Sequence, residues 1–290
     1  MASDRTNIVW LIYEAFQRLF ADEAVPLAGN IAFRTLFSIF PFLIFLTALA
    51  GFFGNANLAD AVVGYLLSVA PERLVNPLAP EIHSILTVPR TGLLSISAIV
   101  TVWSAMAGVD SIRVGLNRAY DLRETRSFWV LYLQSVLFVL LAAVVLLAFA
   151  LLIVFGPVIL VTIETYAPGI RGSFEELDRW RFPIAILLLT GWLLICHRVL
   201  PAKRLTIREV LPGVLLTVLV WIILSVAYSI YLVRFGTFVS TYASLSGLFA
   251  AMFFLYLAAL VLIFGGEVNR VIAIHANPPP PPGFGGIQGL

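Results

Sequence analysis

The stretch from Ser127 to Ile163 reads SFWVLYLQSVLFVLLAAVVLLAFALLIVFGPVILVTI and contains no Asp, Glu, Lys or Arg. A helix needs about 20 apolar residues to cross the hydrocarbon core of a bilayer. This stretch exceeds that length, so we predict a membrane-spanning helix from Phe128 to about Pro157. Its excess length means that the helix must tilt, protrude or break near Gly156 and Pro157.

Five further stretches satisfy the same length requirement and lie on both sides of the first one. They are residues 31–53, 91–109, 182–200, 211–233 and 245–266. Of the whole chain 61% is apolar and 12% is charged, with a mean hydropathy of +1.00. An average soluble domain has about a quarter of its residues charged. We therefore predict an all-α, polytopic membrane protein with about six transmembrane helices and additional amphipathic helices at the membrane surface.

Three segments outside these stretches have other patterns. In residues 8–20 the apolar side chains recur at helical spacing and the polar ones fall largely on the other side. This pattern predicts an amphipathic helix on the membrane surface. Residues 54–90 contain short periodic segments interrupted by prolines, which predicts short interfacial helices. The tail at residues 271–290 is rich in Pro and Gly and is predicted to be disordered. The predicted division is an N-terminal helix at 1–28, a transmembrane domain at 29–270, and this tail.

The distribution of Arg and Lys predicts the orientation of the chain. With the N-terminus in the cytoplasm, twelve of the 18 basic residues lie in cytoplasmic segments and six lie outside. Cytoplasmic loops of membrane proteins carry the excess of Arg and Lys. We therefore expect both termini to be cytoplasmic.

A polar face follows the second predicted span. Asp110, Arg113 and Asn117 occur at i, i+3 and i+7, so a helix places them on one face and the acid can pair with the base. These residues are candidates for a gate or for the wall of a polar cavity. The alternative is that they anchor a helix end at the membrane surface.

Other polar residues at the predicted span ends are candidate substrate or gating residues. Arg34 follows Asn30 near the start of the first span, where Arg34 either snorkels to the surface or pairs with Asp110 or Glu267. Glu267 and Asn269 close the last span after two glycines. They line a close helix contact, form a proton-linked site, or are ordinary interfacial residues.

An uncharged polar run at residues 236–247 precedes the last span and includes Tyr242, a further candidate residue. Hydroxyl groups at this density can hydrogen-bond non-helical backbone that enters the protein interior. A surface turn followed by packing of small residues explains the run equally well.

The sequence contains no pattern that indicates catalysis. The histidines His83, His197 and His275 form no pair with metal-ligand spacing, and Cys196 is the single cysteine. Lys203 is the only lysine, and neither a GxxxxGK loop nor a GxSxG motif occurs. The basic residues are scattered over short loops. We therefore expect no enzyme, no metal or other cofactor, and no nucleic-acid partner.

Several of these motifs together resemble the YihY/BrkB family of bacterial inner-membrane proteins, once described as ribonucleases. The motifs are residues 35–41 (TLFSIFP), Trp103 and Ser104, 116–120 (LNRAY), 211–213 (LPG), 231–236 (YLVRFG), 241–245 (TYASL) and 266–269 (GEVN). The resemblance implies a six-helix protein of the bacterial inner membrane, linked in some members to virulence, with no settled activity. The chain departs from the family pattern at Arg34 and Asp110.

The function that these features favour is a permease or flippase-like transporter of an amphipathic or hydrophobic solute, without an ATPase of its own. Charges at the span ends and the potential helix breakers Pro41, Pro157 and Pro212 are typical of transporters. The expected partners are membrane lipids and an amphipathic solute. The alternative is a non-transporting envelope scaffold that recruits partner proteins. An enclosed polar cavity favours the transporter, and a solid apolar core favours the scaffold.

Overall fold

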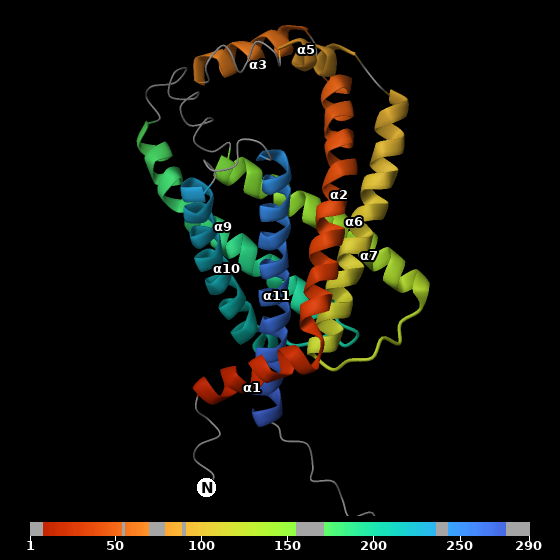
Figure 1. Ribbon diagram of the computed structural model, residues 1–290, viewed down its shortest axis with the longest axis vertical. Coiled ribbons are helices and arrows are strands. Elements are labelled where there is room, and N and C mark those ends of the chain that lie inside the picture. Colours follow the sequence, from red (N-terminus) through yellow and green to blue (C-terminus); the bar gives the residue numbers. More distant parts are fainter. Residues whose placement is uncertain are drawn as a thin grey trace, which may run out of the picture. The chain divides into compact units, whose positions relative to one another are not determined.

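The computed structural model describes residues 8–53, 56–69, 79–88, 91–154, 171–235 and 243–276 (Figure 1). Within these ranges every regular element is a helix, and they include no strand. Tyr242, most of the polar run at 236–247, Gly156, Pro157 and residues 277–290 lie outside the described residues, whereas residues 271–276 of the predicted tail belong to a helix.

Six of the described helices are long and apolar enough to cross a membrane. They are α2 (Ala24–Phe53), α6 (Thr91–Ala119), α7 (Phe128–Phe149), α9 (Arg171–Val199), α10 (Ile207–Phe235) and α11 (Ala243–Ala276). The segment η1 (Ala150–Val154) continues α7 as a π-helix. This confirms the prediction of an all-α polytopic membrane protein. The helices α2, α6, α9, α10 and α11 extend beyond the predicted apolar stretches, and in all of them except α2 the extension includes charged residues.

The predicted helix breakers Pro41 and Pro212 do not break their helices. Pro41 lies inside α2 and Pro212 lies inside α10, and both helices are continuous. A proline removes one backbone hydrogen bond, whereas a broken helix in lipid would leave many backbone groups without partners. The helix is therefore retained at both positions.

Three shorter helices occupy the segments that the sequence predicts as amphipathic or interfacial. They are α1 (Ile8–Ala21), α3 (Ala56–Val69) and α5 (Ala79–Thr87). Their position at a membrane surface stays a prediction.

The chain forms two compact units, each with its own packing. One unit comprises Met1–Ala32 and Asp110–Leu290, and the other comprises Phe33–Val109. In the first unit α10 packs beside α11, and α1 lies across the C-terminal part of α11 (Figure 1). In the second unit α3 packs against α5.

The apolar core of the first unit consists of three clusters that all include α11. Ile263 packs against residues of α1, α2 and α6, while Leu262 packs against α9 and α10. Val268 and Val271 pack against Ala15 of α1. The helix α11 is thus the element around which this unit is assembled.

Glycine permits a close approach between α10 and α11. A Cβ atom added at Gly213 would overlap the carbonyl oxygen of Gly265, and one added at Gly265 would overlap the Thr217 hydroxyl. Small residues let membrane helices approach closely and pack by van der Waals contact. The close contact at Gly265 lies two residues before Glu267.

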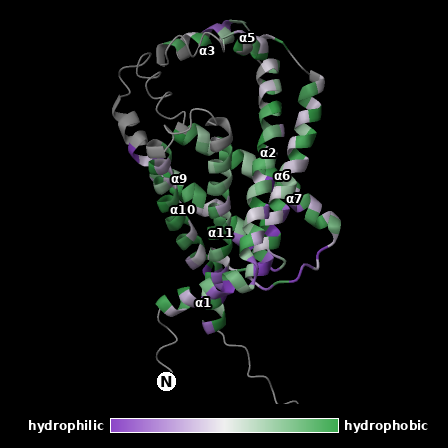
Figure 2. Ribbon diagram, viewed as in Figure 1, coloured by the Kyte–Doolittle hydropathy of each residue, from purple (hydrophilic) through white to green (hydrophobic). Residues whose placement is uncertain are grey.

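Polar side chains of the first unit gather at one end of its helices. Figure 2 shows hydrophilic residues at the ends of α6 and α11 near α1 and along the segment between α6 and α7. By contrast, α7 exposes large apolar side chains along its length, such as Leu133, Leu140 and Val144. Such a surface is suited to lipid. The polar end contains most of the candidate site residues.

Candidate functional site

The ion pair expected between Asp110 and Arg113 forms on α6 and reaches across to α7. Arg113 Nη1 lies 2.9 Å from Asp110 Oδ1, and the Arg113 side chain is only 6% exposed. Arg113 Nη2 donates to the Leu131 carbonyl at 3.2 Å and to the Ser135 hydroxyl. That hydroxyl donates in turn to Asp110 Oδ1 at 2.7 Å. The positive charge of Arg113 is therefore balanced by Asp110, and its guanidinium is hydrogen-bonded to residues of α7.

Asn117 shares the helix face of Arg113 but has different partners. Its amide nitrogen donates to Glu124 Oε2 at 3.1 Å, and its Oδ1 accepts from the Ala202 backbone N–H at 2.7 Å. Asn117 therefore joins the end of α6 to the segment between α6 and α7 and to the segment between α9 and α10.

Arg126 extends this connection to the C-terminus of α9. Arg126 Nη2 lies 2.7 Å from Glu124 Oε2 and donates to the Leu200 carbonyl at 2.8 Å. Gln134 of α7 donates to the Val199 carbonyl at 2.6 Å. These donors satisfy carbonyl groups that the end of a helix leaves free, where a positive charge is also favoured. Hydrogen bonds from Arg126 lower the pKa of Glu124 to about 2, against the opposing effect of burial.

A second set of hydrogen bonds joins α6, α9, α10 and α11. The Tyr120 hydroxyl lies 2.8 Å from His197 Nδ1 and accepts from Asn269 Nδ2 at 2.9 Å. Asn269 also donates to the Val210 carbonyl at 3.0 Å and accepts from the Gly213 N–H at 2.6 Å. Burial raises the pKa of Tyr120. The candidate residue Asn269 therefore bonds directly to α10, next to Pro212.

Glu267 is buried without a hydrogen-bond partner. Its side chain is fully buried, and neither carboxylate oxygen bonds to any residue that the structure describes. Nearby charges pair with one another instead, since Arg270 lies 2.8 Å from Asp121 and Arg18 lies 3.1 Å from Glu14. Buried polar groups nearly always have partners, so this carboxylate is an exception that requires a reason.

The remaining candidate residues lie in different places. Arg34 donates to the Ala107 carbonyl at 3.3 Å, within the unit Phe33–Val109. Its pairing with Asp110 or Glu267 stays a prediction. Asn30 is exposed on α2, and Tyr242 lies outside the described residues.

Six residues that the sequence did not single out as candidates belong to the hydrogen-bonded site. They are Tyr120, Glu124, Arg126, Gln134, Ser135 and His197. The signals available were modest: Tyr120 ends the LNRAY motif, and His197 is a histidine at the end of a span. Among the described residues no group of three or more His, Cys, Asp or Glu is placed to hold a metal ion.

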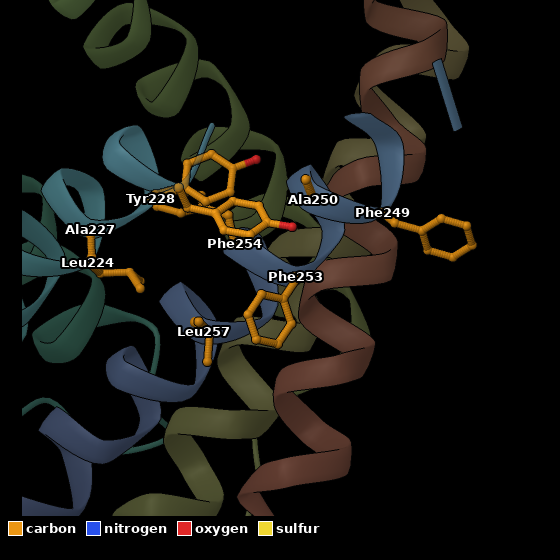
Figure 3. A pocket seen from close by; sticks show the side chains of 9 residues that line it. Leu224, Ala227, Tyr228, Phe249, Ala250, Phe253, Phe254 and Leu257 are labelled. Atoms are coloured by element: carbon orange, nitrogen blue, oxygen red, sulfur yellow. The ribbon is translucent and has the colours of Figure 1, made fainter. Parts of the chain in front are cut away.

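An aromatic groove of about 590 Å³ lies between α10 and α11, in the halves of these helices away from the polar end. Its lining includes Tyr228, Phe253 and Phe254, together with the small residues Ala227 and Ala250 (Figure 3). The Tyr228 and Phe254 rings lie 4.8 Å apart between centroids. The groove is half-enclosed and predominantly apolar, so it differs from the enclosed polar cavity that the sequence leads us to expect of a transporter.

A family profile described as "Virulence factor BrkB" matches residues 15–283. The chain belongs to the BrkB family. This confirms the family resemblance drawn from the motifs, and the match includes every residue of the polar site.

Two groups of relatives extend this comparison. The BrkB-family chain is 32% identical to the ribonuclease-like protein YfkH of Bacillus subtilis, over 89% of this chain and 94% of the relative. It is 24% identical to UPF0761 membrane proteins of Xanthomonas axonopodis pv. citri and Xanthomonas oryzae pv. oryzae. It spans 66% and 64% of their lengths. No solved structure matches the chain significantly.

Proposed function

We propose that this BrkB-family membrane protein binds an amphipathic or hydrophobic solute in the α10–α11 groove and moves it through the membrane without an ATPase of its own. The observation that carries the proposal is the half-enclosed aromatic groove lined by Tyr228, Phe253 and Phe254. A ligand that arrives from the bilayer can enter such a groove without crossing water. An amphipathic molecule suits it because tyrosine presents both a ring and a hydroxyl.

Selectivity in this groove comes from packing. Lipid tails are as apolar as the groove, so the hydrophobic effect does not by itself favour transfer of an apolar chain from the bilayer. Aromatic faces at fixed positions provide contact area and preferred geometries that a fluid lipid tail does not. The small side chains Ala227 and Ala250 leave the space that the solute would occupy.

The test is transport of a fluorescent phospholipid analogue in vesicles that contain the purified protein. Ala250→Trp fills the groove, and we expect it to reduce the transport rate several-fold. The matched control is Ala148→Trp on α7, where the alanine is also half-buried but does not line the groove. Equal rates for the two variants, or no transport above protein-free vesicles, would refute the proposal.

The scaffold alternative is favoured by a separate observation on α1. One face of this helix packs on α11 through Ala15, yet Trp10, Tyr13 and Phe16 are exposed. An apolar face of this kind can bind a partner protein or the membrane surface. If the protein acts as a scaffold, changes in α1 would abolish its cellular role while Ala250→Trp would leave that role intact.

A further inference from the structure

Two connecting segments are held side by side at the polar end of the first unit. The segment at residues 122–127 follows α6, and the segment at residues 200–206 follows α9. Arg126 bonds to the Leu200 carbonyl at 2.8 Å, and Asn117 accepts from the Ala202 N–H at 2.7 Å. The two segments therefore present one fixed surface.

This surface carries an excess of positive charge. Residues 122–127 and 198–209 contain six basic and two acidic side chains. One base, Arg126, is paired with Glu124, and the carboxylate of Glu209 accepts from the Thr206 N–H at 2.6 Å. Five exposed cations remain without an ion pair among the described residues: Arg123, Arg198, Lys203, Arg204 and Arg208.

The absence of ion pairs distinguishes these five residues from three bases near α1 in the same unit. Arg18 pairs with Glu14, Arg118 with Asp22, and Arg270 with Asp121. The fold thus pairs these three bases near α1, whereas the five cations on and beside the two connecting segments form no ion pair with a described residue. A field of one sign attracts ligands of the opposite charge.

The surface also lies where lipid headgroups are expected. Candidate membrane spans end at Ala119 and Val199 and begin at Phe128 and Ile207, so the two segments connect span ends. In the first turn of α7, Phe128 and Trp129 are 69% and 76% exposed. Aromatic residues at a span end mark the level of the headgroups.

We propose that the basic surface formed by Arg123, Arg198, Lys203, Arg204 and Arg208 binds the headgroups of anionic phospholipids in the adjoining leaflet. Arginine suits this role because its planar guanidinium forms two parallel hydrogen bonds to phosphate oxygens. Phe128 and Trp129 contact the upper parts of the same lipids. The proposal stands apart from transport, because it requires neither the groove nor movement of a solute.

The test measures binding of phosphatidylglycerol to purified protein in a neutral detergent by native mass spectrometry, with phosphatidylcholine as the comparison lipid. The variant replaces Arg123, Arg204 and Arg208 with Gln. Each basic residue near an anionic membrane contributes about five-fold in affinity, so we expect the triple variant to bind about 100-fold more weakly. Added salt should weaken wild-type binding in the same direction.

Two controls separate charge from folding. Replacement of the same three residues by Lys keeps the charge and should retain most of the binding. Arg179→Gln, an exposed residue of α9 remote from its C-terminus, should bind as the wild type does. Melting temperatures of all variants without added lipid should agree.

Three results would overturn the proposal. The first is undiminished phosphatidylglycerol binding by the triple Gln variant, and the second is equal binding of phosphatidylcholine by the wild type. The third is binding of polyglutamate without binding of phosphatidylglycerol, which would assign the surface to an acidic protein partner.

Discussion

At the scale of single residues, the Asp110–Arg113 pair joins a half-exposed acid to a buried base. The Asp110 side chain is 45% exposed, whereas that of Arg113 is 6% exposed. We expect Asp110→Ala to lower the free energy of unfolding by about 1–2 kcal/mol, because Arg113 keeps only its uncharged acceptors. Asp60→Ala, which removes an exposed partner of His83, should cost about 1 kcal/mol or less. Thermal unfolding in detergent measures both.

A double substitution isolates the pair itself. If Asp110 and Arg113 interact as the structure shows, the loss in the Asp110→Ala, Arg113→Ala double variant will be smaller than the sum of the two single losses. Strictly additive losses would mean that the two charges act independently.

Glu267 raises the opposite expectation, because its buried carboxylate has no hydrogen-bond partner among the residues that the structure describes. Replacement by Met keeps a similar volume and removes the unsatisfied group, so we expect a gain in stability of about 1–3 kcal/mol. Glu267→Gln keeps a polar group in the same place and should gain less. A melting temperature below that of the wild type in the Met variant would show that the carboxylate makes a stabilising interaction.

The same substitution bears on function. Polar groups that destabilise a membrane protein are retained where they serve a function. If Glu267→Met raises stability and also abolishes activity, Glu267 is a functional residue. If stability rises and activity is unchanged, Glu267 is dispensable for that activity.

Glu124 predicts a pH dependence of stability. Its pKa is lowered from the ordinary 4.5 to about 2 by hydrogen bonds from Arg126, so the unfolded chain binds this proton more tightly than the folded one. The resulting stabilisation is complete above about pH 4.5 and is lost as the pH falls toward 2. We expect the difference in melting temperature between wild type and Glu124→Gln to be largest near neutral pH and to shrink below pH 4.5. A difference that is independent of pH would exclude this linkage.

At the scale of elements, the contact between α10 and α11 depends on Gly213. A methyl group at this position overlaps the Gly265 carbonyl oxygen and also meets the Asn269 side chain. Gly213→Ala should therefore separate the helices and destabilise the protein by about 1–3 kcal/mol. The matched control is Gly191→Ala in α9, where the added atom meets open space and alanine should stabilise by up to about 1 kcal/mol. Equal melting temperatures for the two variants would contradict this helix packing.

The connecting segments depend on side chains from several helices. Asn269 bonds to the backbone at Val210 and Gly213, and Asn117 bonds to the backbone at Ala202. The amide oxygens and nitrogens of these two side chains hydrogen-bond the backbone at the beginning of α10 and in the segment before it. Apolar side chains have no such donors or acceptors. The polar end is therefore a structural junction as well as a candidate site.

At the scale of the whole molecule, the predicted orientation can be tested by labelling. Single cysteines at Thr125 and Ser173 in a Cys196→Ala background lie on either side of the span that begins at Phe128. The twelve-to-six distribution of basic residues predicts that Ser173 is accessible from outside and Thr125 from the cytoplasm. Labelling of both positions from the same side of intact cells would rule out the six-span topology.

The fold class and the approximate spans follow from the amino-acid sequence alone. Length and hydropathy are local properties, and a helix in lipid satisfies its own backbone hydrogen bonds within the segment. Local information therefore sufficed for α7, whose predicted start at Phe128 agrees with the structure. The i, i+3 spacing of Asp110 and Arg113 also predicted their pairing, because it depends only on helix geometry.

Which helices meet, and through which side chains, depends on the three-dimensional packing and is not encoded locally. The bond between Asn269 and Tyr120 joins residues 149 positions apart, and no local pattern encodes that distance. The same holds for His197 beside Tyr120 and for the groove at Ala250. These arrangements depend on how each helix is rotated about its axis and where it crosses its neighbours. Packing of the whole assembly determines both quantities.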